Sequence, residues 1–293
     1  MLSKLNNSSR LDHLLIFGLG YSGRAIAKAA VRAGFNVTIT SRTPNPEPGL
    51  TIISFGAAEE AIAAATHIIA TAAPDEHGDP VLARYGAQIA TAPNLQYIGY
   101  LSTTGVYGDA QGGWVDEDTP PNPQSLRAQR RIAAEAAWSK FPISVDIFRL
   151  AGIYGPGRSM FDDLRTNTAR RVVKPGHLFG RIHRDDIAQG VLKAMQRNAK
   201  SSVTIFNFSD DEPAASADVV VEAASLLGVP PPESVPYEQA ALKMSPMALS
   251  FWAENRRVSN VKTKAALQLT WLYPTYREGL RAILAEELAQ RPA

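Results

Sequence analysis

Hydrophobic positions in the first half of this 293-residue chain form short apolar runs, separated by segments with helical periodicity. The runs predict strands over residues 13–17, 36–40, 51–54, 67–70, 95–101 and 143–150, and the intervening segments predict helices over 25–33, 57–65, 79–89 and 124–140. The strands are apolar on both sides, as buried parallel strands are. The alternation therefore predicts an α/β fold, a doubly wound parallel sheet covered by helices on both faces.

The alternation becomes looser after residue 150. The pattern predicts helices over 159–171, 185–197, 217–227 and 276–290, with a strand over 203–208. We expect one α/β sheet domain over residues 11–175 and a smaller C-terminal α/β lobe over 176–293, interleaved with the sheet domain. In open α/β sheets, ligands bind in the crevice at the carboxyl ends of the strands, where such a lobe would lie.

Three glycines follow the first predicted strand with the spacing G-x-G-x-x-G. Gly18 permits a tight turn, Gly20 lets a pyrophosphate approach the backbone, and Gly23 lets the next helix pack closely on the strand. Tyr21 and Ser22 stand at the start of that helix, whose free N–H groups attract anions. The motif predicts a dinucleotide-binding loop. We therefore expect residues 11–175 to form a dinucleotide-binding Rossmann domain and residues 176–293 to form the substrate lobe.

The end of the second predicted strand indicates which dinucleotide is bound. NAD-binding units of this kind place an acidic residue there to hold the ribose 2′-OH. This chain has Ser41 and Arg42 at that point, and the first acidic residue is Glu47. A guanidinium and a hydroxyl suit a 2′-phosphate, so the sequence favours NADP, with NAD as the alternative. The competing interpretation is that Arg42 is a solvated loop residue.

Composition excludes several classes of function. The chain has no cysteine, which rules out disulfides and thiolate sites and fits a reducing, cytoplasmic location. The net charge of +2 gives no indication of a nucleic-acid or membrane partner. The five histidines show no paired ligand spacing, so no metal site is expected.

Four later segments resemble the extended short-chain dehydrogenase/reductase family, which includes nucleotide-sugar epimerases and dehydratases. They are LSTTGVYG (101–108), WVDEDTP (114–120), RLAGIYGPGR (149–158) and RIHRDDIA (181–188). With the glycine motif they follow the family's order from about residue 13 to 195. The resemblance implies a nicotinamide cofactor and a small-molecule substrate.

The family also implies roles for individual residues. Its substrate-oxygen donor after the fifth strand corresponds to Thr103, with Thr104 beside it. Its Tyr-x-x-x-Lys pair, which performs acid–base chemistry, corresponds to Arg127 and Arg131 when the helix is aligned on Glu135. Arginine stays protonated near neutrality and cannot replace that pair. The chain therefore resembles atypical members of the family. The two arginines form either a cationic patch beside the nicotinamide or a solvated helix face.

Two more arginines are candidates for substrate binding. Arg181 corresponds to an arginine that contacts the diphosphate in nucleotide-sugar enzymes of the family, and Arg158 is a second anion contact. Together they predict an anionic, even phosphorylated, substrate. The competing interpretation pairs Arg181 with Asp185 or Asp186 at a helix start.

Two functions remain open at this level. The first is an NAD(P)-dependent oxidoreductase or epimerase/dehydratase that acts on a small anionic substrate. The second is a non-catalytic, NADP-binding redox sensor or scaffold, which would also retain the glycine motif and lose the tyrosine and lysine. Members of the family often form homodimers, and the sequence leaves that state open.

Overall fold

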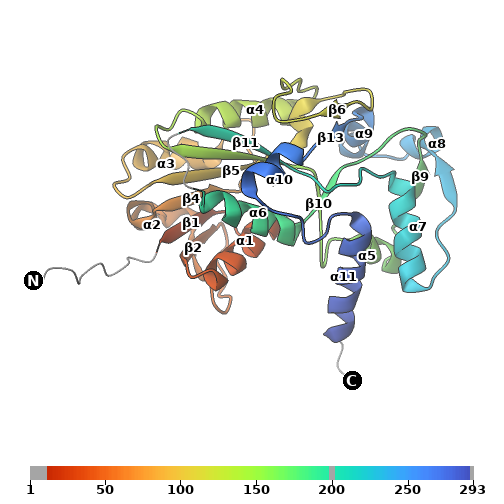
Figure 1. The fold of residues 1–293 in the computed structure, drawn as a ribbon, viewed down its shortest axis with the longest axis horizontal. Helices are drawn as coiled ribbons and strands as arrows, with labels where there is room; N and C mark the ends of the chain where they lie inside the picture. The colour runs from red at the N-terminus through yellow and green to blue at the C-terminus, as the bar shows by residue number, and fades with distance from the viewer. Residues whose placement is uncertain (1–11, 198–201, 291–293) are drawn as a thin grey trace, which may run out of the picture.

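The computed structural model describes residues 12–197 and 202–290, and within them the main sheet has seven strands. The strands pair in parallel in the order β11-β7-β5-β4-β1-β2-β3, which confirms the predicted doubly wound sheet (Figure 1). They are β1 (His13–Phe17), β2 (Asn36–Ser41), β3 (Thr51–Ser54), β4 (His67–Ala70), β5 (Tyr97–Thr103), β7 (Ser144–Leu150) and β11 (Val203–Phe208).

The strand order reverses at β1, which pairs with β2 on one side and with β4 on the other. Phe17, the last residue of β1, is opposite Thr40 of β2 and Ala70 of β4, so the three strands end together. Ligands of open α/β sheets bind at this kind of switch point. The glycine motif follows Phe17 directly and therefore lies there.

Helices cover both faces of the sheet, and each face has its own hydrophobic core. One face is covered by α1 (Tyr21–Arg32) and α6 (Arg184–Met195), which pack against each other. The other face is covered by α2 (Glu59–Ala64), α3 (Pro80–Ala90) and α4 (Leu126–Trp138). The short 3-10 helix η1 (Phe55–Ala57) precedes α2.

The remaining elements form a smaller lobe beyond the carboxyl ends of the strands (Figure 1). Its strands pair as β8 (Gly152–Tyr154) with β10 (Arg181–His183), β9 (Arg171–Val173) with β12 (Ser234–Pro236), and β6 (Trp114–Val115) with β13 (Arg257–Val258). Its helices are α5 (Met160–Arg165), α7 (Ser216–Leu227), α8 (Tyr237–Ala241), α9 (Pro246–Ala253) and α11 (Tyr276–Ala289). The other late helix, α10 (Val261–Leu267), packs instead on β11 and α6 of the main sheet.

The two halves of the chain exchange elements. β11 and α6 follow residue 176 in the sequence but belong to the main sheet and its helical layer, whereas β8 and α5 precede it and lie with the smaller lobe. The division of the chain at residue 175 stays a prediction. Among the described helices, none has both the length and the apolar character that crossing a membrane requires.

The prediction of one long helix over residues 159–171 is wrong. α5 ends at Arg165, and the chain turns through Asn167, whose φ of 55° is left-handed. The Thr166 hydroxyl donates to the backbone carbonyl of Asp162, which gives that carbonyl a partner at the helix end. A left-handed residue stops helix propagation, and the chain continues as β9.

Candidate functional site

The glycine motif forms a tight turn between β1 and α1. Gly18 has a φ of 116°, which side-chain-bearing residues rarely adopt. Two threonines at neighbouring strand ends hold it: Thr40 Oγ1 accepts from the Gly18 amide at 3.2 Å, and Thr71 Oγ1 donates to the Gly18 carbonyl at 3.1 Å. The turn is thus fixed from both sides of the switch point.

The other two glycines differ in their surroundings, and the difference fits a dinucleotide. A Cβ on Gly23 would lie 2.1 Å from the Gly18 carbonyl oxygen, so the close packing of α1 on the loop requires glycine. A Cβ on Gly20 would meet nothing within 4 Å. The space beside Gly20 is therefore open, as the approach of a pyrophosphate to the backbone requires.

The first turn of α1 also lacks internal partners for its N–H groups. Gly20 is the N-cap, no side chain caps the helix, and no acidic residue stands in the first turn. By contrast, the Asp79 carboxylate caps α3 by accepting from two backbone N–H groups. Uncapped N–H groups and the positive end of the helix dipole form an anion site. The open space beside Gly20 and the uncapped first turn of α1 therefore fit the phosphates of a nicotinamide dinucleotide.

Tyr21, which begins α1, joins this loop to the segment after β8. Its hydroxyl donates to the Pro156 carbonyl at 3.1 Å. The guanidinium of Arg158 lies 5.7 Å from the ring centroid, and that of Arg184 lies 5.4 Å from it. Ser22 is buried in the same turn. Arg158, predicted as a substrate contact, therefore lies beside the glycine loop.

The end of β2 brings Ser41 and Arg42 to the edge of the sheet beside the glycine loop. Ser41 Oγ accepts from the Thr43 amide at 3.2 Å, and exposed Arg42 has no hydrogen bond or ion pair with the described residues. Glu47 forms ion pairs with Arg24 at 2.8 Å and Lys28 at 2.7 Å. Both cations hold the pKa of Glu47 below its usual value, with Lys28 contributing most. Glu47 is thus already paired within the loop.

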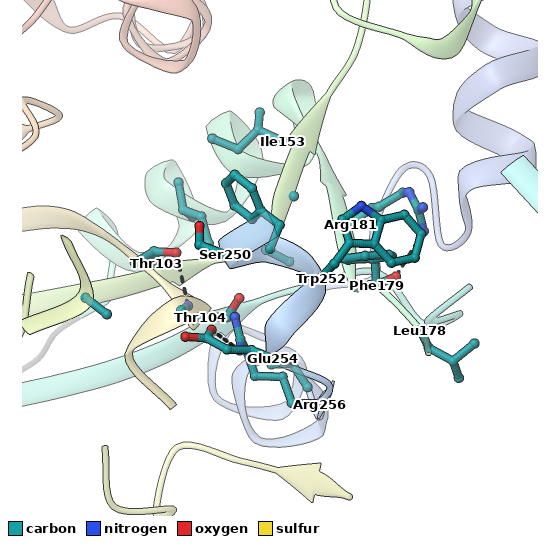
Figure 2. A pocket seen from close by; sticks show the side chains of 18 of the residues that line it. Thr103, Thr104, Ile153, Leu178, Phe179, Arg181, Ser250, Trp252, Glu254 and Arg256 are labelled. Carbon is teal, nitrogen blue, oxygen red and sulfur yellow. Dashed lines mark hydrogen bonds and ion pairs between the residues drawn. The ribbon is translucent and has the colours of Figure 1, made fainter. Parts of the chain in front are cut away.

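The end of strand β5 places two consecutive threonines at a cavity. Thr103 ends the strand and Thr104 begins the 3-10 helix η2 (Thr104–Tyr107). Thr103 Oγ1 accepts from the Gly105 amide at 3.1 Å, so its hydroxyl hydrogen is left to point elsewhere. The neighbouring Ser102 hydroxyl is turned inward and donates to Glu135. Thr103 and Thr104 line a cavity of about 400 Å³ (Figure 2).

The two arginines at the expected tyrosine and lysine positions separate from each other. Arg127 lines the cavity, with its guanidinium 4.6 Å from the ring centroid of Phe251. Arg131 turns towards β5 and donates from Nη1 to the Tyr100 hydroxyl at 2.9 Å and the Leu101 carbonyl at 2.7 Å. Arg127 and Arg131 therefore form neither one cationic patch nor one solvated helix face.

Arg181 lies at the other side of the cavity, on β10 (Figure 2). Its Nη1 donates to the backbone carbonyls of Phe179 at 2.9 Å and Ala214 at 3.2 Å. The alternative that pairs Arg181 with Asp185 or Asp186 is wrong. Asp185 and Asp186, which lie in the first turn of helix α6, each bond to a group other than Arg181.

The partners of those two acids are local. Asp185 pairs with Arg184, and Asp186 accepts from the backbone amides of Leu272 and Tyr273. Burial raises the pKa of Asp186 to about 6. These bonds fix the chain before α11, so the two acids serve the fold. Arg181 lines the cavity of Thr103 and also a second cavity, which Arg158 lines too.

Sequence reasoning missed the wall that α9 and the segment after it provide. Five residues there line the cavity: Ser250, Phe251, Trp252, Glu254 and Arg256. Arg256 Nη1 donates to Glu254 at 2.6 Å and to the Gly108 carbonyl at 2.7 Å, which ties this segment to the turn after η2. The one signal in the sequence of this segment is a pair of adjacent aromatic residues, Phe251 and Trp252, within a short apolar run.

No family profile matches the chain. Protein YeeZ of Escherichia coli (strain K12) is 33% identical over 145 residues, 49% of this chain and 51% of that protein. A 3-diazoavenalumate denitrifying reductase of Streptomyces sp is 25% identical over 178 residues, 57% of this chain and 58% of the reductase. The match thus spans little more than half the length of these curated relatives.

A conserved protein of unknown function from Silicibacter pomeroyi is similar over its whole length. Its solved structure is 41% identical, with a TM-score of 0.86, over 96% of this chain and 100% of that one. The chain belongs to the family of that protein. Its fold is also shared with a putative NAD-dependent epimerase/dehydratase of Methylobacillus flagellatus (24% identity, TM-score 0.71, covering 95% of this chain and 99% of that one).

The human epimerase family protein SDR39U1, solved with NADPH, has the same fold at 18% identity and a TM-score of 0.73, covering 93% of this chain and 99% of that one. These neighbours confirm the fold implied by the resemblance to epimerase/dehydratase-like short-chain dehydrogenases/reductases. The roles of the individual site residues stay predictions.

Proposed function

We propose that this protein is an NADP-binding, atypical short-chain dehydrogenase/reductase that performs oxidoreductase or epimerase/dehydratase chemistry on a small anionic substrate. The observation that carries the proposal is the open, uncapped glycine loop at the switch point of a sheet whose β5 end opens onto a 400 Å³ cavity. That volume is in the range of small-ligand pockets, about 300–1,000 Å³.

The cofactor would be held by residues at three strand ends. Gly18, Gly20 and Gly23 with the first turn of α1 take the pyrophosphate. Ser41 and Arg42 take a ribose 2′-phosphate, since Glu47 is occupied by Arg24 and Lys28. The solved human relative in fold contains NADPH, and another fold neighbour contains NAD, which supports a nicotinamide nucleotide in this loop.

A nicotinamide supplies or accepts a hydride when it is bound. The chain's own task is to bind the reacting oxygen and exchange a proton with it. Thr103, whose hydroxyl hydrogen is free, donates to that oxygen. The proton itself needs another group, because a threonine hydroxyl does not titrate near neutrality.

Glu254 is the group we assign to proton exchange. Five of the described residues lining the cavity carry titratable side chains: Arg127, Tyr154, Arg181, Glu254 and Arg256. The arginines keep their protons, and burial raises the pKa of Tyr154 well above its usual value. Glu254 keeps one carboxylate oxygen without a partner while Arg256 fixes the other. It lies on the same cavity as Thr103 (Figure 2).

One observation favours the sensor alternative. Arg131, at the lysine position, is engaged by β5 and leaves the nicotinamide side without a cation of the usual kind. A crystal structure with NADP⁺ separates the two functions. The enzyme requires the nicotinamide C4 to face the cavity beside Thr103, whereas a C4 face covered by protein would establish the sensor.

Solution measurements test the cofactor assignment independently of any substrate. Calorimetric titration of the full chain should show tighter binding of NADP⁺ than of NAD⁺. Tighter binding of NAD⁺ would reject the assignment of Ser41 and Arg42.

A further inference from the structure

The cavity beside Thr103 is positively charged and poor in groups that recognise sugars. Its described lining contains the guanidiniums of Arg127, Arg181 and Arg256 and one carboxylate, that of Glu254, which is already paired with Arg256. Two cations therefore face the cavity without a carboxylate partner. An anionic group on the ligand would balance them.

Arg181 is the cation placed to hold such a group. Its Nη1 is used by two backbone carbonyls, while Nε and Nη2 have no hydrogen-bond partner among the described residues. The Asp210 carboxylate accepts from the backbone amide of Arg181 and attracts its guanidinium, but no carboxylate of the described residues lies within ion-pair distance of that guanidinium. Burial lowers the pKa of Arg181, and the negative charge of nearby Asp210 opposes that shift. Two adjacent free N–H donors match the two oxygens of a carboxylate.

Aromatic rings form the wall between Arg181 and the mouth of the cavity. The rings of Trp252 and Phe179 meet edge-on with their centroids 5.0 Å apart, and Tyr237 and His177 also pack against Trp252, so this part of the wall is held by several rings. Phe251 is 48% exposed and lies at the cavity edge. Flat aromatic groups pack favourably on such rings.

The neutral polar side chains of the described lining are hydroxyls, those of Thr103, Thr104, Ser125, Tyr154, Ser216 and Ser250. The described lining contains no Asn, Gln, His or Lys side chain. The Ser250 hydroxyl donates to the Met247 carbonyl, and the Ser125 hydroxyl accepts from the Ala128 amide as the cap of α4. The several hydroxyls of a sugar would meet no side-chain amide or imidazole in this described lining, and a sugar hydroxyl left unpaired weakens binding.

We propose that the cavity binds an aryl carboxylate. The carboxylate lies on Arg181, the ring lies against Trp252 and Phe251, and the other end of the molecule reaches Thr103 on the opposite side of the cavity (Figure 2). This inference rests on the proposed function in one respect, that the end of the ligand beside Thr103 is the end that reacts. The proposed ligand is a smaller, planar acid rather than a nucleotide sugar.

The test uses trans-cinnamate as the probe, titrated calorimetrically into the full chain with and without NADP⁺. Cinnamyl alcohol has the same ring without the charge, and UDP-glucose represents the nucleotide sugars. We expect cinnamate to bind at least about ten times more tightly than cinnamyl alcohol, since a charge-assisted pair contributes about that factor. Equal affinity for the two, no binding of cinnamate, or tighter binding of UDP-glucose would each overturn the proposal.

Variants locate the two ends of the ligand. Arg181→Met should weaken cinnamate binding at least about tenfold and leave cinnamyl alcohol unchanged. Phe251→Ala should weaken both ligands several-fold, and its exposed ring makes it safe for the fold. Arg281→Met, an exposed residue of α11 outside the described lining, makes the same change in net charge and should bind as the wild type.

If Arg181→Met fails to fold, the comparison of cinnamate with cinnamyl alcohol and the Phe251→Ala result decide the question. If Phe251→Ala binds cinnamate as tightly as the wild type does, the ligand ring does not contact Phe251, and the proposal is overturned. Cinnamate binding without NADP⁺ binding would reject the cofactor assignment alone. NADP⁺ binding without cinnamate binding would reject this inference alone.

Discussion

Replacing Gly20 and Gly23 by alanine, one at a time, separates the binding role of the glycine loop from its packing role. Gly20 has a φ of −88°, which alanine adopts without strain, and its added methyl group would touch no protein atom within 4 Å. The methyl group would instead occupy the space assigned to the pyrophosphate. Gly20→Ala should therefore keep or slightly raise stability, by up to about 1 kcal/mol through the unfolded chain.

The cofactor affinity of Gly20→Ala should fall. Losing charge-assisted hydrogen bonds from the first turn of α1 corresponds to about 1.5–3 kcal/mol, or about 10- to 100-fold in Kd. In Gly23→Ala the methyl group would lie 2.1 Å from the Gly18 carbonyl oxygen, a backbone atom that cannot rotate away. Overpacking of this kind costs about 1–3 kcal/mol.

Differential scanning fluorimetry and calorimetric titration of NADP⁺ measure the two effects. Each kcal/mol corresponds to about 2–4 °C in Tm for a domain of this size class. Gly23→Ala should melt earlier than Gly20→Ala and also bind poorly. Wild-type NADP⁺ affinity in Gly20→Ala would refute the placement of the pyrophosphate, and equal Tm values for the two variants would refute the packing argument.

Three further substitutions test single contacts. Arg42→Ala should weaken NADP⁺ about tenfold and leave NAD⁺ unchanged, as titration of both will show; equal losses would exclude 2′-phosphate recognition. Arg149→Met removes the guanidinium that lies 2.8 Å from the buried Glu135 carboxylate. The free energy of unfolding, measured in urea, should fall by about 3–5 kcal/mol, and a fall of less than about 1 kcal/mol would contradict this. Burial lowers the pKa of His183 to about 4, so the wild type should lose stability as the pH falls from 6.5 to about 4, by at most about 3 kcal/mol. His183→Asn keeps a capping side chain for α6 and should flatten this dependence; an unchanged slope would assign the acid sensitivity elsewhere.

Much of the main sheet could be predicted because its signals are local. Buried parallel strands are continuous apolar runs, and helices between them begin at recognisable caps such as Asp79 and Ser125. The long helix predicted over 159–171 failed for a local reason too. The turn at Asn167 depends on a single left-handed residue, which periodicity does not reveal.

The opposite wall of the cavity could not be predicted. Phe251, Trp252 and Glu254 come from a segment more than 140 residues after Thr103, and their sequence carries no spacing that points to a site. The orientation of Arg131 was equally hidden. Its helical position is the same whether the side chain faces the cavity or bonds to Leu101, and only packing against β5 decides between them.

The sequence by itself determined the alternation of strands and helices, the glycine loop and the absence of the usual tyrosine and lysine. Those properties depend on residue identity and on spacing along the chain. The tertiary structure decided that Arg181 lines the cavity bonded to backbone carbonyls, that Arg158 lies beside Tyr21, and that α9 forms a wall of the cavity. These depend on contacts between segments far apart in sequence, which burial and hydrogen bonding select only when the whole chain is folded.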